Sequence, residues 1–101
     1  MTINWSTIAP STHAGESGAA QWRTVQSGAA RVRVVEYSPG YFGDHWCERG
    51  HKTICLEGAF TVEYIDGAKE SITAGQSWCA DDGAPGHRLI TPAGAKLFIV
   101  D

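Results

Sequence analysis

The sequence predicts an all-β domain that closes, or nearly closes, into a small barrel or jelly roll. Short segments of alternating apolar and polar residues are separated by turn residues at close spacing, which is typical of such folds. No stretch of ten or more residues shows the 3.6-residue period of an amphipathic helix. The chain has 101 residues, of which 43% are apolar. That length is enough for one hydrophobic core and too short for two ordinary domains.

The first part of the chain differs from the rest. Residues 1–18 are predicted to form an N-terminal arm, and residues 19–101 the β-barrel. Trp5 and Ile8 precede a run rich in Pro, Ser, Thr and Gly at residues 9–18, which favours a loop. A weak signal favours a short helical turn at residues 4–9.

The strands are then predicted from alternation and from the turns between them. Val32 and Val34 alternate with arginines, and Asp66-Gly67 is a strong hairpin signal. The apolar run at residues 97–100 predicts a strand buried on both faces. In order, the predicted strands span residues 21–26, 31–37, 42–47, 52–56, 59–65, 69–73, 77–80, 87–90 and 96–100.

One segment concentrates residue types that bind transition metals. His45, Cys47 and His51 lie within seven residues, in a chain with four His and three Cys. On an extended strand, residues two apart project from one face. A turn at residues 48–50 would return His51 beside them, because Gly tolerates positive φ. With His87 as a fourth donor, we predict a metal site built from strands distant in sequence.

Strand parity predicts which residues share the barrel interior with these donors. If His51 faces inward, Thr53 and Cys55 do too, and Ile54 and Leu56 face outward. An apolar outer face on a small β domain usually contacts a partner, so we expect a homodimer.

Other polar residues near the cluster leave alternatives open. Asp44 and Glu48 flank the ligands, either as proton-transfer groups or as solvated turn carboxylates. Thr53 and Tyr64 are acid–base candidates by parity alone. Cys55 and Cys79 are expected to be packed thiols rather than ligands. Trp46 should point away from the metal cavity, under the N-terminal arm.

The spacing of these residues resembles the two signature motifs of the cupin superfamily. The first motif reads Gly, five residues, His-x-His, three or four residues, Glu, six residues, Gly. Gly40, His45-x-Cys47, His51 and Gly58 match it, with one residue fewer after the first Gly and with Cys and His in place of the second His and the Glu. The second motif is matched by Gly75, residues 81–83 and His87, with Asp for Pro and one extra residue.

Residues 44–47, Asp-His-Trp-Cys, together with Gly50-His51 and residues 94–101, are similar to the small bacterial "DHCW motif" cupin-fold proteins. The match is by content and position rather than letter by letter, and the resemblance covers nearly the whole chain. It implies a small single-domain cupin, also called a double-stranded β-helix or jelly-roll barrel, with a metal site and often a dimer. It implies no particular reaction.

The altered ligands bear on the choice of metal. Three imidazoles and a carboxylate, the usual cupin set, suit Fe(II), Mn(II) or Ni(II), whereas a thiolate with imidazoles suits zinc. We therefore predict a divalent transition metal, zinc first and iron(II) second. An open coordination shell would make the protein a metalloenzyme acting on a small molecule in the barrel mouth. A closed shell would favour the alternative, a non-catalytic metal-dependent binding or sensor module.

Composition excludes some classes of partner. Eight scattered Lys and Arg in a chain of net charge −3 argue against nucleic-acid binding. The sequence contains no run of about 18 apolar residues, so it predicts no membrane-spanning segment. The N-terminus lacks a basic region followed by an apolar stretch, so we expect no secretory signal. An odd number of cysteines then favours free or metal-bound thiols in the cytoplasm.

Overall fold

The computed structural model describes all residues from Met1 to Asp101 and is almost entirely β-structure. A 3-10 helical turn, η1 (Trp5–Thr7), comes first. The strands are β1 (Ser11–Ala14), β2 (Ala19–Ser27), β3 (Ala30–Tyr37), β4 (Tyr41–Phe42), β5 (His51–Tyr64), β6 (Lys69–Thr73), β7 (Ser77–Ala80), β8 (His87–Thr91) and β9 (Ala95–Val100). None of its helices is long and apolar enough to cross a bilayer.

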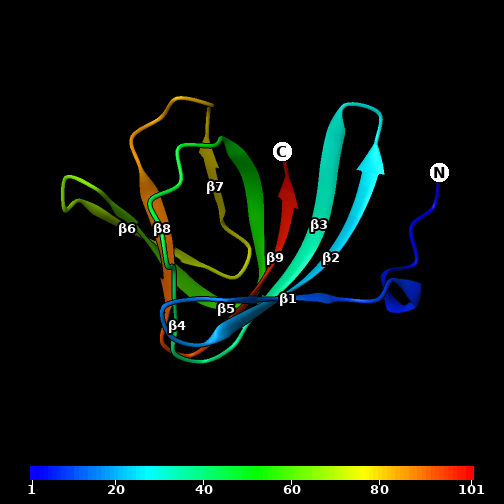
Figure 1. Cartoon of the computed structure of the whole chain (residues 1–101), viewed down its shortest axis with the longest axis horizontal. Coiled ribbons are helices and arrows are strands. Elements are labelled where there is room, and N and C mark those ends of the chain that lie inside the picture. Colours follow the sequence, from blue (N-terminus) through cyan, green and yellow to red (C-terminus); the bar gives the residue numbers. More distant parts are fainter.

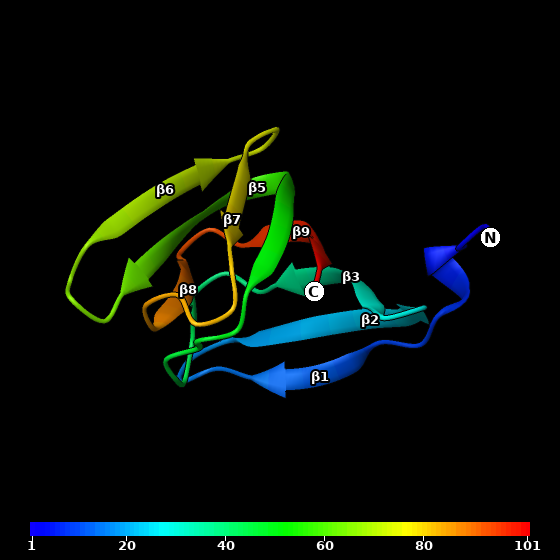
Figure 2. The ribbon, with the colours of Figure 1, turned by 90° about the horizontal axis from the view of Figure 1, so that it is seen from above.

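The strands form a strongly curled antiparallel sheet, as the two views in Figures 1 and 2 show. Their hydrogen-bonded order is β1-β2-β3-β9-β5-β8-β4, and β6 and β7 also pair with β5. The first half of β5 pairs with β7 and β9, and its second half pairs with β6 and β8. Strand β5 therefore links the two walls of a half-closed jelly roll, which confirms the predicted fold class.

A glycine bends β5 where it passes from one wall to the other. The sequence predicts two strands at residues 52–56 and 59–65, but these form one continuous strand with a bulge between Cys55 and Glu57. Gly58 has φ +75°, and a Cβ placed on it would lie 2.3 Å from the Gly94 carbonyl oxygen. Only glycine fits this bend. Gly58 therefore marks a real change of direction, as the sequence predicted, although the chain stays within the sheet.

The predicted strand at residues 42–47 is wrong for most of its length. Strand β4 ends at Phe42, and the following residues run as irregular chain with one isolated bridge between Cys47 and His87. Gly50 also acts differently from the prediction, because its φ is not positive. It is required by close approach, since an added Cβ would lie 2.6 Å from the backbone nitrogen of Asp82.

Part of the N-terminal arm belongs to the sheet. Strand β1 pairs with β2 along its whole length, and η1 forms at the predicted helical turn. The Trp5 ring packs edge-on against Phe98, with ring centroids 6.2 Å apart. The arm therefore helps to cover the outer side of β9.

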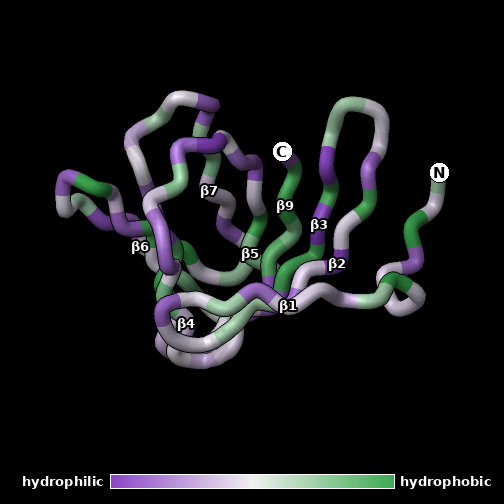
Figure 3. The backbone as a smooth tube through the Cα atoms, in the orientation of Figure 1, coloured by the Kyte–Doolittle hydropathy of each residue, from purple (hydrophilic) through white to green (hydrophobic).

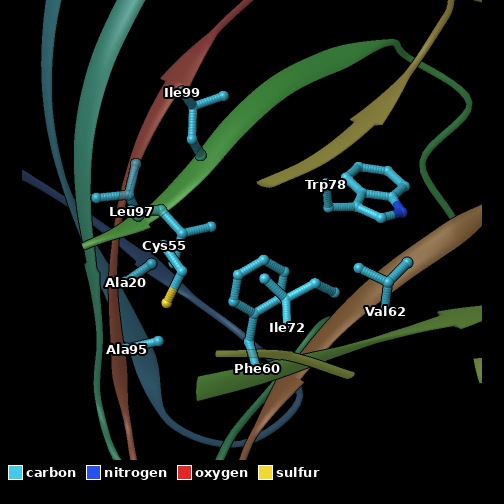
Figure 4. Close-up of a cluster of buried hydrophobic side chains, with 10 residues drawn as sticks. Ala20, Cys55, Phe60, Val62, Ile72, Trp78, Ala95, Leu97 and Ile99 are labelled. Atoms are coloured by element: carbon cyan, nitrogen blue, oxygen red, sulfur yellow. The ribbon is translucent and has the colours of Figure 1, made fainter. Parts of the chain in front are cut away.

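The hydrophobic core lies inside the curl. Hydropathy alternates along β2 and β3, whereas β9 is mostly hydrophobic (Figure 3). Figure 4 shows the main core side chains, and strands β5 and β9 contribute most of them. The buried cluster consists of Ala20, Val35, Cys55, Phe60, Val62, Ile72, Trp78, Ala95, Leu97 and Ile99. The inward parity predicted for β5 is confirmed, since Thr53 and Cys55 are buried while Ile54 and Leu56 are exposed.

Candidate metal centre

A cavity of about 280 Å³ opens between the two walls of the curled sheet. Its deeper lining is apolar and aromatic, and includes Tyr37, Phe60, Val62 and Leu97. Toward the open end the lining becomes polar, with Cys47, His51 and His87 among the contributors. The interior of the protein is thus divided into an apolar floor and a polar mouth.

Three potential metal donors converge at this mouth. The ligand atoms of Cys47, His51 and His87 all lie within 4.8 Å of one another. Backbone pairing accounts for part of the convergence, because the Cys47 and His87 backbones exchange hydrogen bonds of 2.8 and 2.9 Å. His51 begins β5, and its side chain points to the same space, with Nε2 lying 3.7 Å from Cys47 Sγ.

These distances fit a metal ion. Zinc bonds of about 2.3 Å to sulfur and about 2.0 Å to nitrogen, at a tetrahedral angle, hold the two atoms about 3.5 Å apart. The observed separation of Cys47 Sγ and His51 Nε2 is 3.7 Å. His87 Nε2 is buried and has no hydrogen-bond partner, which is unusual for a buried polar atom. A thiol and two imidazoles with one unsatisfied nitrogen form a donor set compatible with a divalent metal.

The hydrogen bonds of the two histidines leave the correct nitrogens free. Nδ1 of His51 donates to the Asp101 carboxylate at 2.7 Å, and Nδ1 of His87 faces the Pro85 carbonyl at 3.4 Å. Because both acceptors are oxygens, the proton belongs on Nδ1 and the lone pair on Nε2. Burial lowers the pKa of both imidazoles, opposed by Asp101 at His51 and by the Pro85 carbonyl at His87. Both side chains are therefore neutral near pH 7, as metal binding requires.

Asp101 is the main functional residue that the sequence analysis missed. Its carboxylate is 1% exposed and accepts hydrogen bonds from His51, Arg31 and Arg33. Burial alone raises the pKa of Asp101, but the hydrogen bonds from Arg31 and His51 and the positive charge of Arg33 outweigh it and hold the pKa below the usual range. A carboxylate that orients a metal-ligand histidine is a common outer partner in metal sites. Nothing local marked Asp101, because its partners lie 50 or more residues earlier.

Two arginines on β3 also face the cavity. Arg31 and Arg33 both bond to Asp101, and the Arg33 guanidinium lies 4.4 Å from the centre of the Trp22 ring. On its other side Trp22 stacks on His13, with ring centroids 3.7 Å apart. Burial lowers the pKa of Arg33, although the nearby Asp101 charge opposes this. The alternation of Arg31 and Arg33 with valines was visible in the sequence, but it did not show that the arginine face is the inner one.

The fourth predicted ligand, His45, does not join the cluster of three. Its side chain is 76% exposed, and its Nδ1 bonds to the Asp44 carboxylate at 2.7 Å. Both residues line the outer part of the cavity. The hydrogen bond from His45 lowers the pKa of Asp44. Glu48 is exposed and does not line the cavity.

The remaining candidates have structural partners. The Thr53 hydroxyl lines the cavity but bonds to the Trp78 backbone, and the Tyr64 hydroxyl bonds to Glu70 and to Trp78 Nε1. Cys55 is a buried free thiol, as predicted, whereas Cys79 is an exposed free thiol, so the prediction that it is packed is wrong. Trp46 is not among the residues that line the cavity, in agreement with the prediction, and the Arg88 guanidinium lies 4.2 Å from its ring centre.

Solved structures with the same architecture are numerous. A predicted oxalate decarboxylase from Thermotoga maritima superposes with a TM-score of 0.83, covering 99% of this chain and 96% of its own, at 18% identity. A sugar phosphate isomerase of the cupin superfamily from Silicibacter pomeroyi superposes with a TM-score of 0.75, covering 99% of this chain and 74% of its own, at 17% identity. This chain has the cupin fold. The polyketide cyclase RemF from Streptomyces resistomycificus is similar too, with a TM-score of 0.81, 18% identity, and coverage of 99% and 77%.

No protein-family model matches the chain, and no curated protein matches it at a significant level. At 17–18% sequence identity, these structural neighbours show only that this chain shares the cupin fold. The chemistry of this cupin-fold protein depends on its own residues.

Proposed function

We propose that this cupin binds a divalent transition metal through Cys47, His51 and His87, and that one coordination position stays open toward the cavity for a small molecule. The observation that carries the proposal is the convergence of three donors within 4.8 Å at the mouth of a cavity. Three protein ligands with an open position are typical of catalytic zinc sites, whereas structural zinc sites use four.

Zinc is the first choice of metal and iron(II) the second. A thiolate with two imidazoles is softer than the usual cupin ligand set, and soft ligands favour zinc. With an open position, the metal would act as a Lewis acid on a bound small molecule. A thiolate ligand must stay reduced, so we retain the cytoplasm as the proposed location.

A metalloenzyme is the function that this arrangement supports best. The structural neighbours include a decarboxylase, an isomerase and a cyclase, so the fold accommodates small-molecule chemistry. The Asp44–His45 pair lines the cavity and is exposed, which suits a proton-transfer group. A non-catalytic sensor with a closed coordination shell would need no such pair.

Metal analysis tests the ligand assignment. Protein purified without an affinity tag should contain about one zinc or iron per chain, and Cys47→Ala and His87→Ala should each lose most of it. Cys79→Ala and His13→Ala are matched controls, because Cys79 is exposed and His13 is stacked on Trp22. Wild-type protein that carries almost no metal and cannot be reconstituted would overturn the assignment.

Cobalt substitution tests whether the shell is open. The visible spectrum of the cobalt-loaded protein should shift on titration with azide, which needs a free coordination position. An intense tetrahedral spectrum that does not respond would mean a closed shell and would favour the sensor alternative.

The same residues suggest a second function. Cys47 Sγ, His51 and Asp101 form a line in which the imidazole lies 3.7 Å from the thiol and 2.7 Å from the carboxylate. This is the arrangement of a thiol nucleophile with its base and orienting carboxylate. A nucleophilic triad leaves the unpaired Nε2 of His87 without a role, and for that reason metal binding is the primary proposal.

Cysteine labelling separates these two functions. With zinc bound, iodoacetamide should modify Cys79 and leave Cys47 unreacted, and removal of zinc should restore reaction at Cys47. Cys55 is an internal control, because it is buried in the core. Rapid labelling of Cys47 in zinc-loaded protein, with unchanged metal content, would favour the nucleophile.

We also retain the homodimer as a proposal. Ile54 and Leu56 are 37% and 44% exposed on the outer face of β5. A second copy packing on this face would cover them. Light scattering at micromolar concentration should give twice the monomer mass, and a strict monomer would remove the proposal.

A further inference from the structure

Building on the proposed metal site, we infer that the cavity binds a small organic monocarboxylate. One carboxylate oxygen accepts a hydrogen bond from Nε of Arg33, beside the metal donors. The apolar body of the ligand packs on the aromatic and aliphatic floor of the cavity.

The first support is an unused hydrogen-bond donor. Arg33 is 3% exposed and lines the cavity, and its Nε has no hydrogen-bond partner. Its Nη2 is already bonded to Asp101 at 2.7 Å. A buried donor on a charged group is costly when it lacks an acceptor, so an acceptor oxygen of a ligand that reaches Nε from the cavity would be stabilised.

The second support is the charge of the cavity. Four of the eight Lys and Arg residues line it, in a protein of net charge −3, and Asp44 is the only acidic residue among the lining residues. Arg88 is paired with Glu63, and Arg49 is exposed at the rim. Inside, Arg31 and Arg33 share the single carboxylate of Asp101. One positive charge is left over among these three side chains, which favours an anionic ligand.

The third support is the position of Arg33 relative to the metal donors. Arg33 Nη2 and His51 Nδ1 both bond to Oδ2 of Asp101, each at 2.7 Å, so the two side chains are neighbours. The Trp22 ring lies against the Arg33 guanidinium and limits its movement. A carboxylate held by Arg33 therefore lies near His51, one of the three proposed donors.

The floor of the cavity limits the size and polarity of the ligand. It is formed by apolar and aromatic side chains, among them Phe60, Val62 and Leu97. The volume of about 280 Å³ is at the lower end for small-molecule sites. A single aromatic ring or a short aliphatic chain with one carboxylate fits these limits, and benzoate is a suitable probe.

The test is a calorimetric titration of the zinc-loaded protein with benzoate, benzamide and inorganic phosphate. Benzoate should bind at one site, and benzamide, which lacks the charge, at least about tenfold more weakly. Arg33→Lys keeps the positive charge but loses the Nε donor, and should weaken benzoate binding about tenfold or more. Arg23→Lys is the matched control, because Arg23 bonds to the Ile8 carbonyl and does not line the cavity.

Zinc content and affinity, measured on the same samples with a chromogenic chelator, separate this inference from the metal site. Bound zinc with no benzoate binding, or with benzoate binding that Arg33→Lys leaves unchanged, overturns the inference and leaves the metal site standing. Phosphate binding more tightly than benzoate also overturns it. If no zinc binds, the proposed function fails, and the same titration on metal-free protein still decides whether Arg33 binds a carboxylate.

A direct measurement covers the case in which Arg33→Lys does not fold. In wild-type protein, benzoate ring protons should show nuclear Overhauser effects to the methyl groups of Val62 and Leu97. Effects confined to surface methyls such as those of Ile65, which is 61% exposed, would contradict the inference.

Discussion

The two ends of the barrel interior are built from the same strands but differ in chemistry. Strand β5 contributes His51 to the polar mouth and, a few residues later, Cys55 and Phe60 to the apolar floor. At the mouth, buried polar atoms are bonded to one another or left free toward the cavity. At the floor, the buried side chains are apolar and carry no charge.

The two inward cysteines show what this difference means. Cys55 is fully buried in the core, its thiol donates to the Glu57 carbonyl, and burial raises its pKa. Cys47 is only half-buried, and its sulfur faces the imidazole of His51. A thiol in apolar surroundings stays protonated and inert, whereas one beside imidazoles can ligate a metal or react. Residue type alone therefore does not determine the role of a cysteine.

The comparison predicts that the two ends can be damaged separately, and the largest effect is expected at the floor. Leu97, 1% exposed, fills the core beneath the cavity. Leu97→Ala should lower the free energy of unfolding by about 2–5 kcal/mol because it leaves a void in the packing. Urea unfolding of the metal-free protein measures this. Ile65→Ala is the exposed control and should change the same quantity by less than about 0.5 kcal/mol.

At the mouth, a smaller but specific effect is expected from Asp101→Asn. Loss of the carboxylate weakens the orientation of His51, so zinc affinity should fall by about 10- to 100-fold. Chelator competition measures the affinity, at a temperature where circular dichroism shows both proteins folded. Glu36→Gln is the control, since Glu36 is exposed and pairs only loosely with Arg23 and Lys96.

Equal zinc affinity in wild type and Asp101→Asn would mean that Asp101 has only a structural role. In that case Asp101→Asn would lower the free energy of unfolding without changing zinc affinity. A substitution at the mouth would then affect only stability, as is expected for one at the floor.

The smallest effect is expected at the rim. His45→Ala should change zinc affinity by no more than about twofold, because the side chain is exposed and lies outside the donor cluster. The same chelator competition measures it beside His87→Ala, which should lose most of its affinity. A comparable loss in both variants would mean that His45 is a fourth ligand, as the sequence predicts, and that the rim closes over the metal.

Local pattern was sufficient to predict most of the fold. Alternation and turn residues predict the strands on either side of Ser27-Gly28 and of Asp66-Gly67, because hairpins are local structures. The strand predictions failed where the same local residue pattern is compatible with two structures. Gly58 marks a bend within one long strand rather than a turn between two, and the chain after Phe42 leaves the sheet although its residues suit a strand.

By itself, the sequence determined the fold class, the inward face of β5, and Cys47, His51 and His87 as candidate donors, because ligand types are rare and strand parity is regular. Only the tertiary structure decided which donors meet and what surrounds them. His45 lies apart because the loop that carries it is not a strand. Asp101 and Arg33 join the site because β9 pairs with β3 and β5. Long-range pairing of this kind depends on the closure of the whole sheet, and no local segment contains that information.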